Sequence, residues 1–224
     1  MIGFWRQAVE FARRDLIAER RAGEVVAIVI PFGAVALMTL PFALSIDTAV
    51  ISRVGPAMFW VVTLLFAMQI ALRHSAADGA HQRRVISLLG VDPLARLTGR
   101  ALAAALLILA FMAVMFPLMM FLYGPELPSS WYLALIPAAL AGFGLAEIGT
   151  LAAEVTAGLR VRSTLAPLIV APLAIPLLIA GSQALESLAR GGGILPWVLL
   201  VTATDLALAV TAALIARPLE DAAR

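Results

Sequence analysis

Long apolar stretches separated by short polar segments fill almost the whole chain. Each stretch is long enough to cross a hydrocarbon core of about 30 Å at a rise of about 1.5 Å per residue. The pattern predicts six membrane-spanning helices, at 25–45, 55–72, 101–123, 131–155, 165–186 and 195–216. We therefore expect an all-α membrane protein in which residues 1–224 form a single transmembrane domain.

The segment before the first predicted span has a different pattern. Apolar residues recur at helical spacing over 3–21: Phe4, Trp5, Ala8, Val9, Ala12, Leu16 and Ile17. Charged residues take the opposite face: Arg6, Glu10, Arg13, Arg14 and Arg20. Such a pattern predicts an amphipathic helix, within segment 1–23, that lies in the membrane interface. The alternative is a solvated tail.

Arginine supplies all 16 basic residues, and these are divided unevenly between the two sides of the predicted membrane. If the N-terminus is cytoplasmic, 14 of them lie on the cytoplasmic side and 2, Arg53 and Arg190, on the other. Cytoplasmic segments of membrane proteins are enriched in positive charge. The bias therefore predicts that both termini are cytoplasmic, which agrees with an even number of spans.

The longest polar connection, 73–100, is predicted to be cytoplasmic. Asp78 and Gly79 form a turn, and the next ten residues have the pattern of a short amphipathic helix. Val85, Ile86, Leu88 and Leu89 give its apolar side, and Gln82, Arg83 and Arg84 its polar side. Asp92 and Pro93 then begin the helix that enters the third span.

Three carboxylates in the predicted spans are candidates for an intramembrane role. Glu147 and Glu154 are seven residues apart in the fourth span and share one helix face, and Asp205 is near the middle of the sixth. Such groups are costly in a bilayer, so they belong either to a polar pathway or proton relay or to hydrogen bonds with Thr, Ser or Gln on neighbouring helices. We favour the second interpretation, because no Arg or His falls within the predicted spans.

Composition excludes several function classes. Apolar residues make up 62% of the chain and charged residues 13%, which leaves no room for a globular domain outside the membrane. Without lysine there is no P-loop, and without cysteine no thiol chemistry. His74 and His81, the two histidines, are both in the 73–100 loop, so we expect no metal site or cofactor in this chain. The arginines are scattered over short segments, so we expect no nucleic-acid partner. An intramembrane hydrolase using Glu147 and Asp205 is a weak alternative.

Glycine and proline modify two of the predicted spans. Gly142, Gly144 and Gly149 in the fourth span allow close approach of neighbouring helices. Three prolines, Pro167, Pro172 and Pro176, lie close to one face of the fifth span. They indicate either ordinary kinking or an element that moves or lines a substrate path.

This plan resembles that of ABC-2-type exporter permeases, and in particular the CcmB family of haem exporter subunits. Three stretches carry the resemblance: FWRQAVEFARRDL at the N-terminus, RVGPAMFWVVTLLFAMQIAL at 53–72 with the following Asp78-Gly79, and GLRVRSTLAPLIVAPLAIPLLIAGSQAL at 158–185. The PLAIPLLI run is the most specific part.

The resemblance implies a permease subunit of the bacterial inner membrane that acts in cytochrome c maturation. It implies a homodimer bound to two copies of a CcmA-like ATPase, with CcmC-like and CcmD-like membrane proteins in the same complex. The coupling segment would then comprise Asp78, Gly79, Arg83, Arg84, Val85, Ile86 and Leu89, and haem would be bound by a partner. An ABC-2 permease for a lipid, glycan or drug, and a non-transport scaffold of cytochrome assembly, remain open alternatives.

Overall fold

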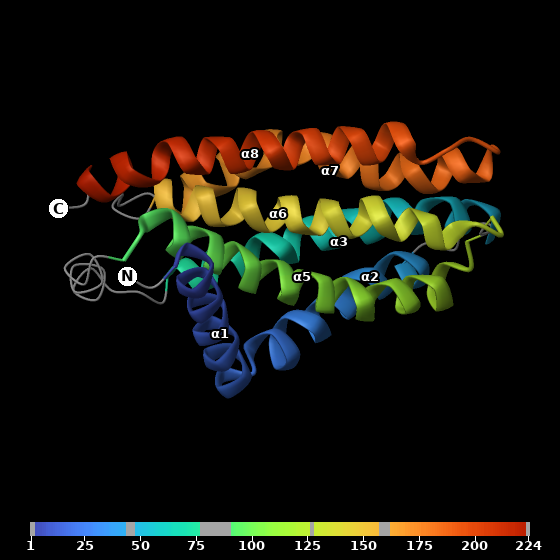
Figure 1. Ribbon diagram of the computed structural model, residues 1–224. Helices are drawn as coiled ribbons and strands as arrows, with labels where there is room; N and C mark the ends of the chain where they lie inside the picture. Colours follow the sequence, from blue (N-terminus) through green and yellow to red (C-terminus); the bar gives the residue numbers. More distant parts are fainter. Residues whose placement is uncertain (1–2, 44–47, 77–90, 126–127, 157–161, 223–224) are drawn as a thin grey trace.

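The described part of the chain is an all-helical bundle. The computed structural model describes residues 3–43, 48–76, 91–125, 128–156 and 162–222, and every regular element in these ranges is a helix. Five long helices lie side by side along one axis (Figure 1): α3 (Thr48–Ala76), α5 (Pro93–Tyr123), α6 (Leu135–Val155), α7 (Arg162–Ala189) and α8 (Leu195–Ala222). The predicted fold class is confirmed.

Length and composition identify five membrane-spanning candidates among the described residues. They are Val50–Leu72, Pro93–Tyr123, Trp131–Val155, Leu165–Ala189 and Leu195–Ala216, which correspond to the second to sixth predicted spans. The predicted span at 25–45 is different. This segment is long and apolar enough to cross a membrane only when Val25–Thr39 is counted together with the preceding helix Phe4–Ala22, and the two are bent by 55° relative to each other. The last residues of the predicted span lie outside the described ranges.

The bend has a local cause at Gly23. Helix α1 (Phe4–Ala22) ends there with a φ of 65°, a left-handed conformation that glycine adopts without strain, and the Gly23 N–H donates to the Glu19 carbonyl oxygen. The Glu19 side chain then accepts from the Val25 N–H at 2.6 Å. The chain continues as a π-helical turn, η1 (Val25–Val29), into α2 (Ile30–Ala43).

Helix α1 lies across the bundle close to the start of α5 (Figure 1). The two backbones approach closely, because a Cβ built on Gly99 would lie 2.4 Å from the Ala8 carbonyl oxygen. Ala8 and Ala12 are buried, whereas Trp5 and Val9 are exposed. The helix is thus confirmed, but its apolar face is divided. The small residues Ala8 and Ala12 pack against the bundle, whereas the bulky residues Trp5 and Val9 are on the exposed surface of the helix.

Helix α5 begins where the sequence predicted. Asp92 caps its N-terminus by accepting from the Leu94 N–H at 3.0 Å, and Pro93 follows at the first helical position. The Asp92 N–H donates to the Gln7 side chain at 3.1 Å, which fastens α1 to this end of the bundle. Because α3 continues to Ala76, both ends of the predicted 73–100 loop are helical.

Helix α6 is the centre of the bundle and contacts α3, α5, α7 and α8. Three glycines make these contacts close. A Cβ on Gly149 would lie 2.3 Å from the Ala71 Cβ of α3, one on Gly142 3.1 Å from the Met112 Sδ of α5, and one on Gly144 2.7 Å from the Leu177 side chain of α7. The predicted role of these glycines is confirmed.

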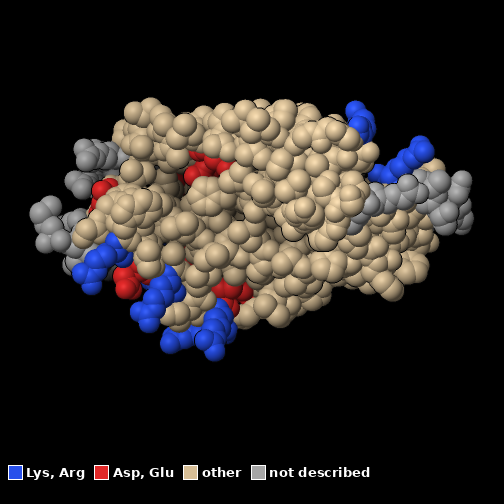
Figure 2. All heavy atoms as spheres, turned by 45° about the vertical axis from the view of Figure 1, so that its right-hand side comes forward, with Lys and Arg blue, Asp and Glu red and all other residues tan. Residues whose placement is uncertain are grey.

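The opposite end of the bundle is fixed by Tyr123. Its hydroxyl donates to the Leu37 carbonyl oxygen of α2 at 2.8 Å, and its ring fills the space that a side chain at Gly55 of α3 would need. Figure 2 shows arginine side chains gathered at the α1 end and again at the far end, with uncharged surface between them. Helix α1 contributes several exposed arginines, and Arg53, near the start of α3, and Arg190, directly after the end of α7, are exposed as well.

The α1–α5 crossing generates a stability prediction. Gly99→Val should lower the free energy of unfolding by about 1–3 kcal/mol, because its side chain forces α1 away from α5. Gly193→Val is the matched control, since a Cβ there meets nothing within 4 Å. Helical circular dichroism during heating in detergent micelles measures the effect. Equal unfolding midpoints for the two variants would contradict the close crossing.

Candidate functional site

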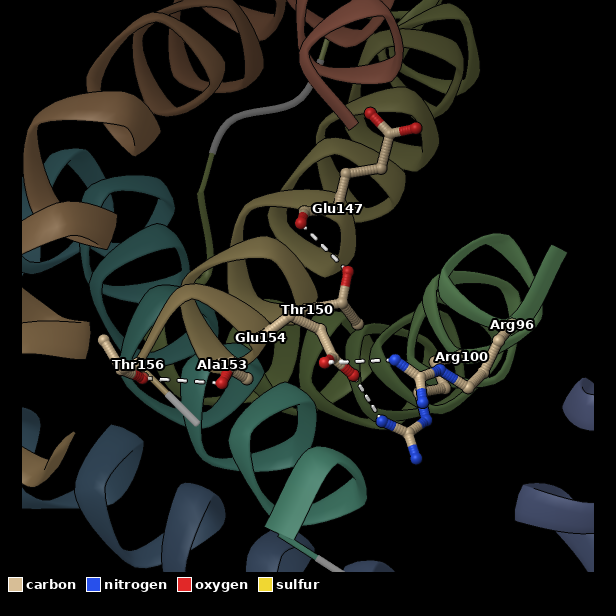
Figure 3. Close-up of polar contacts among 7 residues, drawn as sticks. All are labelled: Arg96, Arg100, Glu147, Thr150, Ala153, Glu154 and Thr156. Atoms are coloured by element: carbon tan, nitrogen blue, oxygen red, sulfur yellow. Dashed lines mark hydrogen bonds and ion pairs between the residues drawn. The ribbon is translucent and has the colours of Figure 1, made fainter. Parts of the chain in front are cut away.

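A buried charge cluster joins α5 to the C-terminal end of α6. The Glu154 Oε1 accepts from the Arg100 Nη1 at 2.5 Å, and the Glu154 Oε2 lies 3.6 Å from the Arg96 Nη2. The Arg100 side chain is only 3% exposed. One carboxylate therefore lies between two guanidinium groups one helical turn apart (Figure 3). Such a charge-assisted arrangement in a low-dielectric setting fixes the relative position of both helices.

This cluster corrects the interpretation of Glu154. The sequence placed Arg96 and Arg100 in a cytoplasmic segment, and no basic partner was expected for the intramembrane acids. Both arginines in fact belong to α5, whose apolar helix extends from Pro93 to Tyr123. The available signal was their four-residue spacing after a Pro-initiated helix start, which puts both on one face.

Glu147 and Asp205 are placed differently. Glu147 points away from the arginine pair (Figure 3), and its buried Oε2 has no hydrogen-bond partner among the described residues. The buried Oδ1 of Asp205 on α8 likewise has none. That oxygen packs against the backbone of Gly144, one turn before Glu147 on α6. The hydrogen bonds to Thr, Ser or Gln expected from the sequence are therefore absent for these two oxygens.

A cavity of about 340 Å³, which we call the interface cavity, lies beside Glu147 at the α1 end of the bundle. It is lined by residues of α1, α5, α6 and α8: Phe4, Trp5, Leu94, Leu97, Thr98, Ala101, Phe143, Glu147, Thr150, Leu151, Ala209 and Ala212. The Thr150 hydroxyl donates within its own helix, to carbonyl oxygens of Ala146 and Glu147 at 2.9 Å. Glu147 provides the ionisable group in this lining.

A second cavity, of about 360 Å³ and nearly all apolar, lies toward the opposite end. We call it the aromatic cavity. Its wall contains Phe59, Trp60, Phe116, Trp131 and Met112. Phe116 stacks on Trp131 with ring centroids 5.7 Å apart. The three prolines of α7 line neither cavity, so a substrate-lining role for Pro167, Pro172 and Pro176 finds no support in these two cavities.

The residues predicted to couple to an ATPase lie outside the described ranges. They all fall within 77–90: Asp78, Gly79, Arg83, Arg84, Val85, Ile86 and Leu89. His81 also lies there. Within the described ranges, no group of three or more His, Cys, Asp or Glu side chains could hold a metal ion.

Taken together, the bundle, the helix lying across it and the few buried charges define a multi-pass helical membrane protein. Residues 6–220 match the CcmB protein family. The chain is 32% identical over 210 residues to the heme exporter protein B of Paracoccus denitrificans, covering 89% of this chain and 93% of the relative. It is 30% identical over 205 residues to that of Pseudomonas aeruginosa, covering 88% and 89%. The chain belongs to the CcmB family, as its resemblance indicated.

The charge cluster generates the second prediction. Glu154→Ala should destabilise the chain by about 3–5 kcal/mol, because the buried Arg100 loses its carboxylate partner. Glu186→Ala is the control. It removes an ion pair with Arg190 in which both side chains are about half exposed or more, and such pairs contribute at most about 1 kcal/mol. Unfolding in mixed micelles of increasing SDS content measures both. Similar losses of unfolding free energy in the two variants would show that the buried cluster stabilises the chain no more than an exposed ion pair does.

Proposed function

We propose that this chain is the transmembrane permease subunit of an ABC-type haem export system that serves cytochrome c maturation. The observation that carries the proposal is the family match over residues 6–220, together with relatives named heme exporter protein B. The all-helical bundle supports it, because its long apolar helices and small described extramembrane segments suit a permease.

The energy source lies in a separate subunit. The chain has no lysine and so no P-loop, which means that ATP hydrolysis requires a partner. That partner is a CcmA-like cytoplasmic ATPase, and the segment 78–90 is the element that docks in its groove through apolar anchors. A homodimer of this chain, with CcmC-like and CcmD-like membrane proteins, completes the proposed complex.

The proposed orientation puts both termini in the cytoplasm of a bacterium, with the bundle in its inner membrane. Figure 2 shows arginines at both ends of the molecule. Helix α1 carries exposed arginines, and Arg53 near the start of α3 and Arg190 directly after α7 are also exposed. Helix α1 lies across the bundle and exposes Trp5 and Val9 beside its arginines, as an interfacial helix does. The α1 end of the bundle therefore faces the cytoplasmic leaflet.

Haem is substrate rather than a resident group of this chain in the proposed scheme. Three of the methionines that the sequence groups in α5, Met112, Met115 and Met119, are buried in the hydrophobic core. Thioethers at helical spacing within a core serve packing. Axial ligation of the haem iron by a partner's histidine is consistent with this arrangement.

The third prediction tests the ATPase partner. Leu89→Asp places a charge on the apolar side of the proposed docking helix, and it should abolish co-purification of the ATPase while membrane insertion persists. Gln82→Asp is the matched control, because it adds the same charge to the polar side. Affinity purification of the tagged chain from membranes measures the retained ATPase. Normal retention with Leu89→Asp would refute the docking role of this segment.

The fourth prediction tests the orientation. The chain has no cysteine, so single cysteines can be introduced without background labelling. Ser129→Cys, between α5 and α6, should react with a membrane-impermeant maleimide in intact cells. Arg14→Cys, exposed on α1, should react only after permeabilisation of the membrane. The reverse pattern would place the termini on the outer side.

A further inference from the structure

The interface cavity contains a carboxylate that no basic residue of its lining neutralises. Glu147 faces it, and the other lining residues are apolar or carry hydroxyl groups. Arg96 and Arg100 of α5 are engaged by Glu154, and Glu147 points away from this pair (Figure 3). A carboxylate in such a position is a recognition element for a cation that comes from outside the chain.

A second carboxylate, Asp205, lies between α8 and α6. Asp205 is on the α8 face that also carries the lining residues Ala209 and Ala212, but it does not itself line the cavity, because its Oδ1 is buried against Gly144 of α6. Asp205 is only 9% exposed, and its Oδ1 has no hydrogen-bond partner among the described residues. Two acceptor groups on α6 and α8 thus lack donors on the same side of the bundle.

The rest of the cavity wall shows what kind of cation fits. Phe4 and Trp5 of α1 contribute aromatic rings, 5.3 Å apart and edge to face, and aromatic faces attract organic cations. Thr98 contributes a hydroxyl group, and Leu94, Leu97 and Leu151 contribute apolar surface. The volume of about 340 Å³ falls within the range of about 300–1,000 Å³ that is usual for small-molecule sites.

The level of the cavity in the membrane identifies the source of the cation. The cavity is bounded by the same turns of α5 that α1 crosses at Gly99. Trp5 is 68% exposed, and the α5 residues of the lining, Leu94 to Ala101, lie in the first turns of the candidate span Pro93–Tyr123. The end of a span, with an exposed tryptophan beside it, is where lipid headgroups meet acyl chains. A lipid therefore reaches this site from the bilayer, with its headgroup beside Glu147 and its acyl chains along the apolar surface.

We propose that the interface cavity binds the primary ammonium headgroup of an aminophospholipid of the cytoplasmic leaflet, with Glu147 as its counter-ion. A primary ammonium carries three N–H donors, which suits the Glu147 carboxylate and the hydroxyl groups of Thr98 and Thr150. A quaternary ammonium has none. A bare metal ion is a poor fit, since the described residues offer no group of three ligating side chains.

The test uses the purified full-length chain in detergent, with native mass spectrometry to follow the binding of single lipids. The probes are dioleoyl phosphatidylethanolamine, phosphatidylcholine and phosphatidylglycerol, which share their acyl chains. Phosphatidylethanolamine should bind about tenfold more tightly than the other two, the effect expected of one charge-assisted hydrogen bond. Glu147→Gln should remove this preference while keeping the shape of the side chain.

Two further variants test whether lipid binding also depends on the space in the cavity, and whether a charge change far from the cavity leaves it unaffected. Ala212→Leu fills the cavity without changing any charge and should also weaken phosphatidylethanolamine binding. Glu186→Gln, exposed at the other end of the molecule, should leave the preference intact. The measurement requires neither the ATPase nor haem, so its failure would leave the proposed transport function untouched.

Several outcomes would overturn the proposal. A preference that persists in Glu147→Gln would exclude the carboxylate as counter-ion. Equal binding of phosphatidylethanolamine and phosphatidylcholine would assign recognition to the aromatic rings alone. Displacement of the lipid by free ethanolamine at comparable concentration would identify a soluble amine as the ligand, and no preference over phosphatidylglycerol would mean that the cavity has no role in headgroup selection.

Discussion

Close packing around α6 is the constraint on which the whole bundle depends. Inside a bilayer, helix association gains little from the hydrophobic effect and relies on van der Waals contact between closely spaced backbones. Gly142, Gly144 and Gly149 bring α6 against different neighbours, and the space for the Leu177 and Met112 side chains exists because these positions lack a Cβ. The positions of the described candidate carboxylates follow from these contacts, because Glu147 and Glu154 lie on α6 and Asp205 packs against it.

The charges at one end of the bundle form two arrangements with opposite consequences. Glu154 is held between two arginines of α5, which gives a closed and structural cluster. Among the described residues, Glu147, which lines the interface cavity, and Asp205 each keep a buried oxygen without a hydrogen-bond donor. Buried acceptors are costly unless they are satisfied. The first arrangement therefore positions helices, whereas the Glu147 carboxylate of the second is available to a ligand.

The sequence predicts the helices well, because length and apolar composition are sufficient for that inference. The start of α5 at Asp92 and Pro93 and the close contacts of the α6 glycines also followed from local chemistry. The pairing of Arg100 with Glu154 could not be predicted from local chemistry. The two residues are 54 positions apart, and they meet only because of how α5 and α6 are rotated about their axes. The sequence also did not predict that Ala8 and Ala12 of α1 would be buried while Trp5 and Val9 are exposed. Apolar periodicity shows which residues share a helix face, but not whether that face contacts protein or lipid.

The central claim is that this chain belongs to the machinery that supplies haem for cytochrome c maturation. The most direct test deletes the chain from its host and stains membrane and soluble proteins for covalently bound haem. The account predicts that c-type cytochromes lose their haem while their polypeptides are still made, and that the intact chain restores them. Normal levels of haem-bearing c-type cytochromes in the deletion strain would contradict it.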